Sequence, residues 1–299
     1  MKTAERTLFL ATVLSFIIIA DCLAQNPQRP FPNSDWKKTD TLGVTIVRIS
    51  YEMTFRKALS FNSSEIDNDT FGMKQDFSDH GYATDSRIIE IGNGIKKDYS
   101  QILEETEQEN RKITTGAAPN LAKPIYPYEF ITLQDGRFIT TVRFLNIILR
   151  YEDSSGKIQW ALTGRNSTID GLNCSEATTH LCGRDYAAWF CPGIPIDGGP
   201  WKFHGLPGII VKVDDTEGHY SWKMTGLEKG SWPIYEKQYN FRKCDKAEAE
   251  KAIQNMYAHP FAFIKAIGIK FHVVENGKTR EPGKAELEKS FYYDPLELE

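Results

Sequence analysis

The sequence predicts a mainly β fold, either a strongly curved antiparallel sheet or an open half-barrel, with one or two peripheral helices. Three observations support this prediction. Apolar and polar residues alternate with a period of two in several segments, which is the pattern of half-buried strands. Short breaks rich in Gly and Asp separate these segments, as expected of antiparallel hairpins. Only two segments favour helix, so the strands are expected to form the body of the fold.

The composition is that of a folded globular chain. Its 299 residues include 36 Lys and Arg, 40 Asp and Glu and 40% hydrophobic residues, and the net charge is −4. These values exclude collagen-like, coiled-coil and wholly disordered chains. No nucleic-acid partner is expected, because binding to nucleic acid requires a strong basic excess.

The first 24 residues predict a secretory signal peptide, followed by a single domain over 25–299. An apolar run from Leu8 to Ala20 is followed by a small-residue cleavage motif that ends at Ala24. The run is too short to span a bilayer, which takes about 20 residues, and no later segment is apolar enough, so no transmembrane segment is expected. A lipoprotein with Cys22 at its mature N-terminus is the alternative, but Asp21 fits its processing site poorly. We therefore expect an exported protein that is periplasmic, associated with the outer membrane, or secreted.

The N-terminal half contains one strong strand signal and a weaker region. From Thr45 to Phe55 the odd positions are apolar or β-branched and most even positions are polar, which predicts a half-buried strand. Residues 60–86 are rich in Asn, Ser and Asp and are typical of a loop. Residues 98–112 favour a helix, and their short apolar stripe predicts that this helix faces solvent. Three prolines make 114–127 a linker, so a loose insertion is expected at about 56–125.

Strand signals are denser in the C-terminal half. A β-branched and aromatic run covers 138–151, and alternating patterns follow at 158–162 and 220–224. The breaks at 153–156 and 214–218 carry Asp and Gly and are typical of hairpin turns. This spacing predicts an antiparallel meander.

One clear helix is expected after these strands. Asp245 is a favourable N-cap for the Ala-, Glu- and Lys-rich residues 246–258, and Pro260 follows where the helix should end. We expect this helix to pack on the sheet.

The segment from residue 169 to 210 carries four motifs in a fixed order. They are Gly171-Leu172-Asn173-Cys174 with Ala177, Gly183-Arg184 with Ala188-Trp189-Phe190, Ile194-Pro195-Ile196 with Gly199-Pro200-Trp201-Lys202-Phe203, and Gly205-Leu206-Pro207-Gly208-Ile209-Ile210. Their order resembles that of the GLPGLI family of exported Bacteroidetes proteins, with departures at Leu172, Phe190 and Cys191. The closing residues 293–298 also resemble the end of that family's sequences. The resemblance implies an exported protein, and because the family's function is undefined it implies no activity.

The last of these motifs can be explained by structure alone. Pro207 and Gly208 suit the centre of a type II turn, since Pro fixes φ and Gly accepts a positive φ. Ile209 and Ile210 then continue as a buried strand. A second turn at 198–200 should deliver aromatic side chains into the same core.

The alternative interpretation of these motifs is a ligand-binding cleft. Trp189, Trp201 and Phe203 are candidates for its aromatic rim, with Arg184 beside them, because aromatic concavities bind apolar or sugar-like ligands. The leading function is accordingly a non-enzymatic module that binds an apolar small molecule, a peptide or an envelope protein. No cofactor is expected.

An exported hydrolase-like enzyme is the alternative function. Asp214, Asp215 and His219 could converge with Arg184 in a site, although 214–218 is also typical of a turn. The sequence contains no paired-histidine metal motif, phosphate-binding loop or G-x-S-x-G motif. No metal site and no catalytic residue is therefore assigned.

Four cysteines remain after the signal peptide, and export favours disulfides. If 177–181 and 184–190 pair through a two-residue turn at Cys182-Gly183, opposed residues have numbers that sum to 365. Cys174 and Cys191 also sum to 365, which makes them the preferred bridge and leaves Cys182 and Cys244 as the second. Buried free thiols are the alternative, and a slip of one residue in the turn would separate the preferred pair.

Overall fold

The computed structural model describes residues 37–56, 71–72, 81–110, 126–144, 147–154, 156–266, 271–275, 278–288, 290 and 292–299. The predicted signal peptide at 1–24 lies outside these residues, as does most of the predicted loop at 60–86. Within the described residues, no helix is long and apolar enough to cross a membrane.

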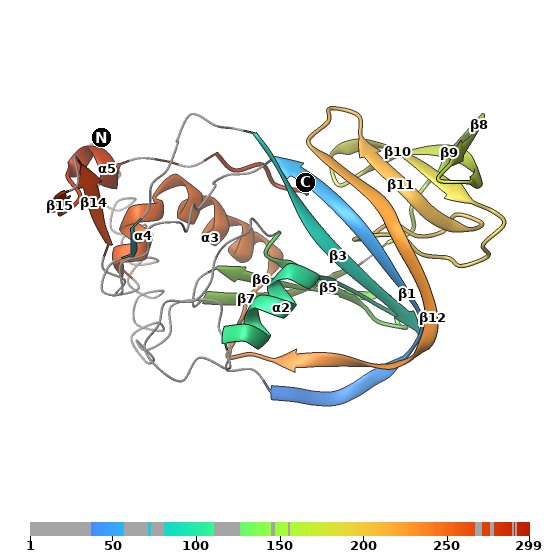
Figure 1. Cartoon of the computed structure of the whole chain (residues 1–299), viewed down its shortest axis with the longest axis horizontal. Coiled ribbons are helices and arrows are strands. Elements are labelled where there is room, and N and C mark those ends of the chain that lie inside the picture. The colour runs from blue at the N-terminus through green and yellow to red at the C-terminus, as the bar shows by residue number, and fades with distance from the viewer. Residues whose placement is uncertain are drawn as a thin grey trace, which may run out of the picture.

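A single sheet of twelve strands forms the body of the molecule (Figure 1). In spatial order its strands are β13 (Arg242–Lys243), β7 (Ile147–Ser154), β6 (Arg137–Phe144), β5 (Tyr128–Thr132), β4 (Ile95–Ser100), β3 (Tyr82–Gly92), β1 (Lys37–Arg56), β12 (Tyr220–Gln238), β11 (Ile209–Asp215), β10 (Arg184–Cys191), β9 (Leu172–Leu181) and β8 (Ala161–Ile169). All neighbours are antiparallel except β13 and β7. The two ends of this order do not pair, so the sheet stays open, and the predicted mainly β class is confirmed.

Short helices and a small second sheet complete the described structure. The helices are α2 (Gln101–Asn110), α3 (Lys246–Ala258), α4 (Pro260–Ala266) and α5 (Lys284–Leu287), and the second sheet has the order β15 (Lys278–Arg280), β14 (Phe271–Glu275), β2 (Phe71–Gly72). In Figure 1 the long strands β1, β3 and β12 bend around one side of the molecule, and α2, α3 and α4 appear inside the bend.

Strand β1 shows how the sequence pattern builds the core. Its odd residues from 47 to 55 are all at most 7% exposed, and they are Val47, Ile49, Tyr51, Met53 and Phe55. The polar residues between them point to the other face, since successive side chains alternate across a strand. This confirms the predicted strand at 45–55, which the structure extends to Lys37–Arg56.

Part of the predicted insertion belongs to the main sheet. Within 56–125, strand β3 pairs with β1, β4 pairs with β3 and β5, and α2 follows β4 directly. The expectation that the helix at 98–112 faces solvent was also wrong, because Leu103 and Glu107 on α2 are 1% and 0% exposed. The cause is a set of cations on the sheet that pair with its acidic residues, as described below.

Helix α3 begins and ends where the sequence predicts. The Asp245 side chain accepts a hydrogen bond from the backbone of Glu248, and the Glu248 side chain accepts one from the backbone of Asp245. This reciprocal capping box satisfies backbone donors that a helix start leaves unpaired. Ala249 and Ile253 on α3 are buried, and they pack against β6 and β7 residues of the sheet.

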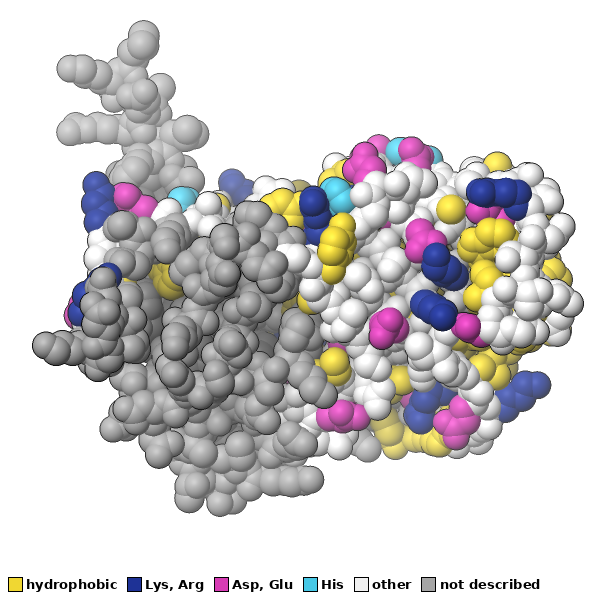
Figure 2. Space-filling view, turned by 45° about the horizontal axis from the view of Figure 1, so that its top comes forward, with side chains coloured by type: hydrophobic (Ala, Val, Ile, Leu, Met, Phe, Trp, Pro, Cys, Tyr) yellow, Lys and Arg dark blue, Asp and Glu magenta, His cyan; other side chains and the backbone are white. Residues whose placement is uncertain are grey.

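Both edges of the large sheet are shielded against further strand pairing. Strand β13 has only two residues. Strand β8 has eight of its nine residues exposed, but its register slips between Leu162 and Asn166, and Gly164 there has a φ of +78°. A bulge and a very short edge strand both discourage edge-to-edge association. On the face that Figure 2 presents, Lys and Arg side chains lie close to Asp and Glu side chains across the described surface.

Candidate functional site

The hairpin of β9 and β10 has the predicted register. Arg184 opposes Leu181, and each later pair from Asp185 with His180 to Phe190 with Ser175 keeps the sum of 365. The two turn residues, Cys182 and Gly183, have φ values of +49° and +79°. Two successive positive φ values characterise the type I′ turn that suits the twist of a hairpin. The short turn therefore fixes which residues face each other along both strands.

Gly208 allows the segment after this hairpin to return close to it. Its φ is +150°, and a Cβ atom placed on it would lie 2.2 Å from the Cys191 carbonyl oxygen. No side chain can occupy that space. Ile209 and Ile210 follow as fully buried residues of β11, which confirms the predicted buried strand. The predicted type II turn was wrong: the φ of Gly208 is far from the value of about +80° that this turn requires, the Gly208 amide donates to the Leu206 carbonyl, and the Ile209 amide donates instead to the Ile194 carbonyl.

The loop at 198–203 is anchored by polar groups of β4. The Trp201 amide donates to Asp98 Oδ2 at 2.7 Å, and Arg87 donates to the other oxygen of Asp98 at 2.7 Å. Lys96 Nζ donates to the carbonyls of Gly199 and Phe203, both at 3.1 Å. Burial lowers the pKa of Lys96 to about 8, against a smaller opposite effect from Asp98. The loop and the opposite half of the sheet are thus joined by buried hydrogen bonds.

Trp201 combines backbone strain with an unsatisfied polar atom. Its φ is +48°, a left-handed conformation that costs about 1–3 kcal/mol in a residue with a side chain. The side chain is 1% exposed, yet its Nε1 has no hydrogen-bond partner. Buried polar groups are nearly always paired in proteins, so such an exception requires an explanation.

A small cavity of about 20 Å³ lies against Trp201. Its walls are mainly aromatic and include Tyr126, Tyr128, Tyr151, Trp201 and Tyr293. Two carboxylates, those of Glu250 and Glu297, also line it. Burial raises the pKa of Glu250, and the nearby Glu297 adds to that rise although Lys246 opposes it. We call this space the aromatic cavity.

One wall of the aromatic cavity is the segment 292–299, which Arg184 holds in place. Arg184 Nη2 donates to Asp294 Oδ1 at 2.6 Å and to the Pro295 carbonyl at 2.7 Å. Its Nη1 lies 3.0 Å from Asp215 Oδ2. The Arg184 side chain is only 2% exposed, so these charges meet with little water around them. Charge-assisted hydrogen bonds in such surroundings are strong.

Lys202 holds the same segment three residues further along. Its Nζ lies 2.9 Å from Glu297 Oε1 and 3.0 Å from Asp153. Burial alone would lower the pKa of Lys202, but Glu297, Cys182 and Asp153 together outweigh it and the pKa is raised. Lys246 of α3 adds a contact of 2.7 Å to Glu297. The motif residue Lys202 therefore links the loop, β7 and the 292–299 segment.

Apolar and backbone contacts fill the space between these charges. Leu296 is 7% exposed and belongs to the main core. Tyr293 stacks on Tyr257 of α3 with ring centroids 4.7 Å apart. The Tyr220 hydroxyl donates to the Asp294 carbonyl at 2.5 Å, and the Leu298 amide donates to the Cys182 carbonyl at 2.9 Å.

The hydrolase-like arrangement is found in part. His219 Nδ1 lies 2.9 Å from Asp294 Oδ2 and 3.1 Å from Arg184 Nη1, so Asp215, His219 and Arg184 do converge. Asp214 lies apart and pairs with Lys212 at 2.6 Å. The centre of the cluster is occupied by Asp294 from the chain itself. On the other side of the ring, His219 Nε2 lies 3.5 Å from Arg56 Nη1.

The three predicted rim aromatics do not share an open cleft. Phe203 is 0% exposed and contacts Trp201 and Tyr186 with ring centroids 5.3 and 4.9 Å away, so it belongs to the core. Trp189 is half-buried, and it lies on the opposite face of β10 from Tyr186 and Ala188, because successive side chains alternate across a strand. Of the three, Trp201 alone lines the aromatic cavity. Arg184 anchors the cavity wall.

Cys174 and Cys191 are brought together by the predicted register. Both are buried, and both are present as free thiols. Burial raises the pKa of the Cys174 thiol, and the Cys191 thiol beside it adds to that rise. Cys182 and Cys244 are also free: Cys182 lies 3.8 Å from Lys202 Nζ, and the Cys244 thiol donates to the Arg150 carbonyl at 3.8 Å. The Cys174–Cys191 bridge stays a prediction.

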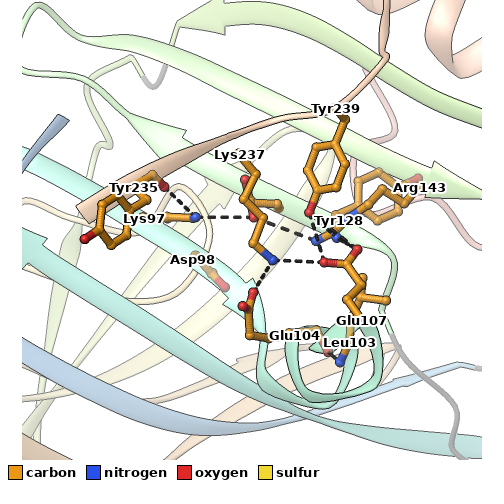
Figure 3. A network of polar contacts seen from close by, with 12 residues as sticks. Lys97, Asp98, Leu103, Glu104, Glu107, Tyr128, Arg143, Tyr235, Lys237 and Tyr239 are labelled. Carbon is orange, nitrogen blue, oxygen red and sulfur yellow. Dashed lines mark hydrogen bonds and ion pairs between the residues drawn. The ribbon is translucent and has the colours of Figure 1, made fainter. Parts of the chain in front are cut away.

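A second polar cluster lies between α2 and the sheet (Figure 3). We call it the buried ion network, and its members are Lys97, Glu104, Glu107, Glu129, Arg143 and Lys237. Lys237 contacts Glu104 and Glu107 of α2, at 2.9 Å for Glu107, and Arg143 contacts Glu107 and the Tyr239 hydroxyl. Lys97 lies 3.5 Å from Glu129. Three cations thus balance three carboxylates.

The buried ion network fixes α2 on the sheet. Burial would raise the pKa of Glu129, but Lys97, Arg143 and Lys237 together lower it. At Glu104, Lys237, Gln108 and Lys97 together outweigh burial, and the pKa is lowered. The sequence pattern does not reveal this network, because the cations that contact α2 lie on distant strands. Arg143 is 36 residues from Glu107, and Lys237 is 133 residues from Glu104. Within the described ranges, no group of three or more His, Cys, Asp or Glu side chains is placed to hold a metal ion.

These observations define an open, mainly β protein with an aromatic cavity lined in part by the chain's own segment 292–299. Residues 172–212, which include the β9–β10 hairpin and the 198–208 loop, match the model of a family described as a protein of unknown function (Porph_ging). No curated protein matches the chain. Two crystal forms of PNGF-II, in space groups P21 and C2, are similar with TM-scores of 0.42 and 0.41 and 13% identity. Each match covers 72% of this chain, which spans about a third of PNGF-II (34% and 33%).

Proposed function

We propose that the protein is an exported binding module whose aromatic cavity holds a small sugar-like ligand against Trp201. The observation that carries the proposal is the Trp201 indole. Trp201 lines the cavity, its backbone is held in a strained conformation, and its buried indole N–H has no hydrogen-bond partner. Backbone strain of this kind collects at functional sites. An acceptor oxygen of a ligand would satisfy the indole N–H.

The chemistry of the cavity walls supports a polyhydroxylated ligand. Aromatic rings offer flat apolar faces, and a few polar groups among them set specificity. The carboxylates of Glu250 and Glu297 are hydrogen-bond acceptors for hydroxyl groups. Trp201, whose indole carries a hydrogen-bond donor, belongs to the same lining. This combination suits a molecule with one apolar face and a rim of hydroxyls.

Ligand entry requires the segment 292–299 to move. The cavity has room for about one water molecule, far less than a sugar ring needs. The segment belongs to no strand or helix and is held by the side chains of Arg184, Lys202 and Lys246. The closed structure therefore corresponds to the ligand-free state of the module.

Export and membership of the GLPGLI family are parts of this proposal. The signal-like residues 1–24 and the ordered motifs at 169–210 support them. The periplasm or the outer membrane is then the place of action. This part of the proposal is tested by N-terminal sequencing of the exported protein, which should begin at Gln25.

Binding can be tested by thermal unfolding of the full chain with a panel of mono- and oligosaccharides. A ligand that binds the folded state alone stabilises it by about 2.7 kcal/mol at 100 times its Kd. Trp201→Phe keeps an aromatic ring but removes the donor, and one hydrogen bond is worth about 0.5–1.5 kcal/mol. We expect about 2- to 12-fold weaker binding in this variant and unchanged binding in Trp189→Phe. Equal loss in both variants, or no stabilisation by any sugar, would contradict the proposal.

A further inference from the structure

The segment 292–299 occupies its groove as a bound peptide would. Its described residues form neither helix nor strand, and its anchors are side chains of β10, of the 198–203 loop and of α3. The contact from Arg184 to Asp294 joins residues 110 positions apart. Recognition through separate pockets for alternate side chains is a common mode of peptide binding.

Two buried cations each form an ion pair with a carboxylate of the 292–299 segment. Arg184 and Lys202 are 2% and 3% exposed, and they contact Asp294 and Glu297 respectively. Without the segment, each cation would keep one acidic partner, Asp215 for Arg184 and Asp153 for Lys202. Buried charges without sufficient partners are costly, so the vacated groove would favour an incoming anionic group.

The two residues between the carboxylates, Pro295 and Leu296, also contribute to the fit of the segment in the groove. Leu296 enters the main core, and Pro295 limits Asp294 to extended backbone conformations. The groove thus selects an acidic residue, then Pro, an apolar residue and a second acidic residue. The groove also binds the backbone of the segment: Arg184 donates a hydrogen bond to the Pro295 carbonyl, and Tyr220 donates one to the Asp294 carbonyl.

From this geometry we propose that the groove is a peptide-recognition site. Its partner is an extended acidic peptide with the pattern Asp-Pro-apolar-Glu, and the chain's own 292–299 segment occupies the site in cis. An attached segment competes at roughly millimolar effective concentration. A partner peptide in trans therefore binds well only when the attached segment is weakened or displaced.

The test uses the full chain with its own segment weakened by the double substitution Asp294→Ala and Glu297→Ala. A fluorescent peptide with the sequence of residues 292–299 is titrated into this variant and into the unchanged chain. We expect at least 10-fold tighter binding to the variant, together with an upward shift of its unfolding temperature. A peptide with Asn and Gln in place of the two acids should bind at least 10-fold more weakly.

Two controls keep the test decisive. Glu297→Gln alone is the milder variant if the double variant does not fold, and it should also bind the peptide more tightly than the unchanged chain. Asp170→Ala removes an exposed partner of Lys223 in the turn between β8 and β9, outside the groove contacts named above, and should leave peptide binding unchanged. If a folded variant does not bind the acidic peptide, or binds the neutral peptide equally well, the proposal is wrong. No sugar is present, so failure here is distinct from failure of the proposed function.

Discussion

At the scale of single residues, backbone geometry explains why certain motif positions carry Gly. Gly208 has a positive φ, and an added Cβ would overlap the Cys191 carbonyl. Gly218, in the turn between β11 and β12, has a φ of +76° but has no atom within 4 Å of an added Cβ. The two positions therefore separate the effect of φ from the effect of close backbone contact.

Replacing each of these glycines by Ala tests this explanation. Gly218→Ala should lower the free energy of unfolding by about 1 kcal/mol, because only the left-handed backbone is penalised. Gly208→Ala should cost at least about 3 kcal/mol, since the backbone of β10 must also shift. Urea unfolding followed by circular dichroism measures both. Similar losses at the two positions would show that the contact with Cys191 does not matter.

Lys96 gives the loop a pH-dependent anchor. Its pKa is lowered to about 8 from an ordinary value of 10.5, mainly by burial. Between these two values the unfolded chain binds more protons than the folded one, so the free energy of unfolding rises with pH across this window. Below pH 8 the full penalty of the buried charge is present. The expected rise is roughly 1–3 kcal/mol.

The variant Lys96→Met isolates this contribution. Urea unfolding at pH 7.5, 8.5 and 9.5 should show that stability changes more favourably with rising pH in the unchanged chain than in the variant. The raised pKa values of the Cys174, Cys182 and Cys244 thiols oppose the rise above about pH 9 in both proteins alike. The raised pKa values of buried tyrosines have the opposite effect only above about pH 10. Parallel pH profiles for the two proteins would exclude Lys96 as the source.

At the scale of elements, α2 is held by charge rather than by an apolar stripe. The pKa values of Glu104 and Glu129 are lowered by the surrounding cations. Their stabilising contribution is therefore full above the ordinary value of 4.5 and is lost as the pH falls through the lowered pKa. The unchanged chain should lose more stability between pH 5 and 3 than Glu129→Gln, which cannot titrate. A steeper loss in Glu129→Gln, measured by thermal unfolding, would contradict this account.

The register of the β9–β10 hairpin predicts the redox state of Cys174 and Cys191. This register brings the Cys174 and Cys191 thiols together, and an exporting pathway would expose them to oxidising conditions. We expect non-reducing peptide mapping of the exported protein to find Cys174 linked to Cys191. A Cys174 that is alkylated in the native, unreduced protein would rule the bridge out. The variant Cys191→Ser provides the reference for the unlinked state.

The elements also show what the sequence can predict. Local patterns were sufficient for β1, for the capped helix α3 and for the β9–β10 register, because each depends on neighbouring residues. The strained Trp201 could not be predicted, since its amide is held by Asp98, 103 residues away. The same holds for Glu107 on α2, whose partners Arg143 and Lys237 lie on distant strands.

At the scale of the whole molecule, the motifs converge on one region. The hairpin supplies Arg184, the loop supplies Trp201 and Lys202, and the 292–299 segment closes over them. Parts of the chain 110 residues apart thus build and anchor the aromatic cavity. The sequence suggested an aromatic site but placed it in an open cleft, because docking of a distant segment leaves no local pattern.

Native mass spectrometry of the full chain, purified without denaturation, tests the central claim most directly. If the aromatic cavity binds a sugar-like ligand through Trp201, the unchanged chain and Trp189→Phe should carry a bound molecule of carbohydrate mass. Trp201→Phe should carry several-fold less of it. The absence of any bound carbohydrate, or equal amounts in all three proteins, would contradict the account.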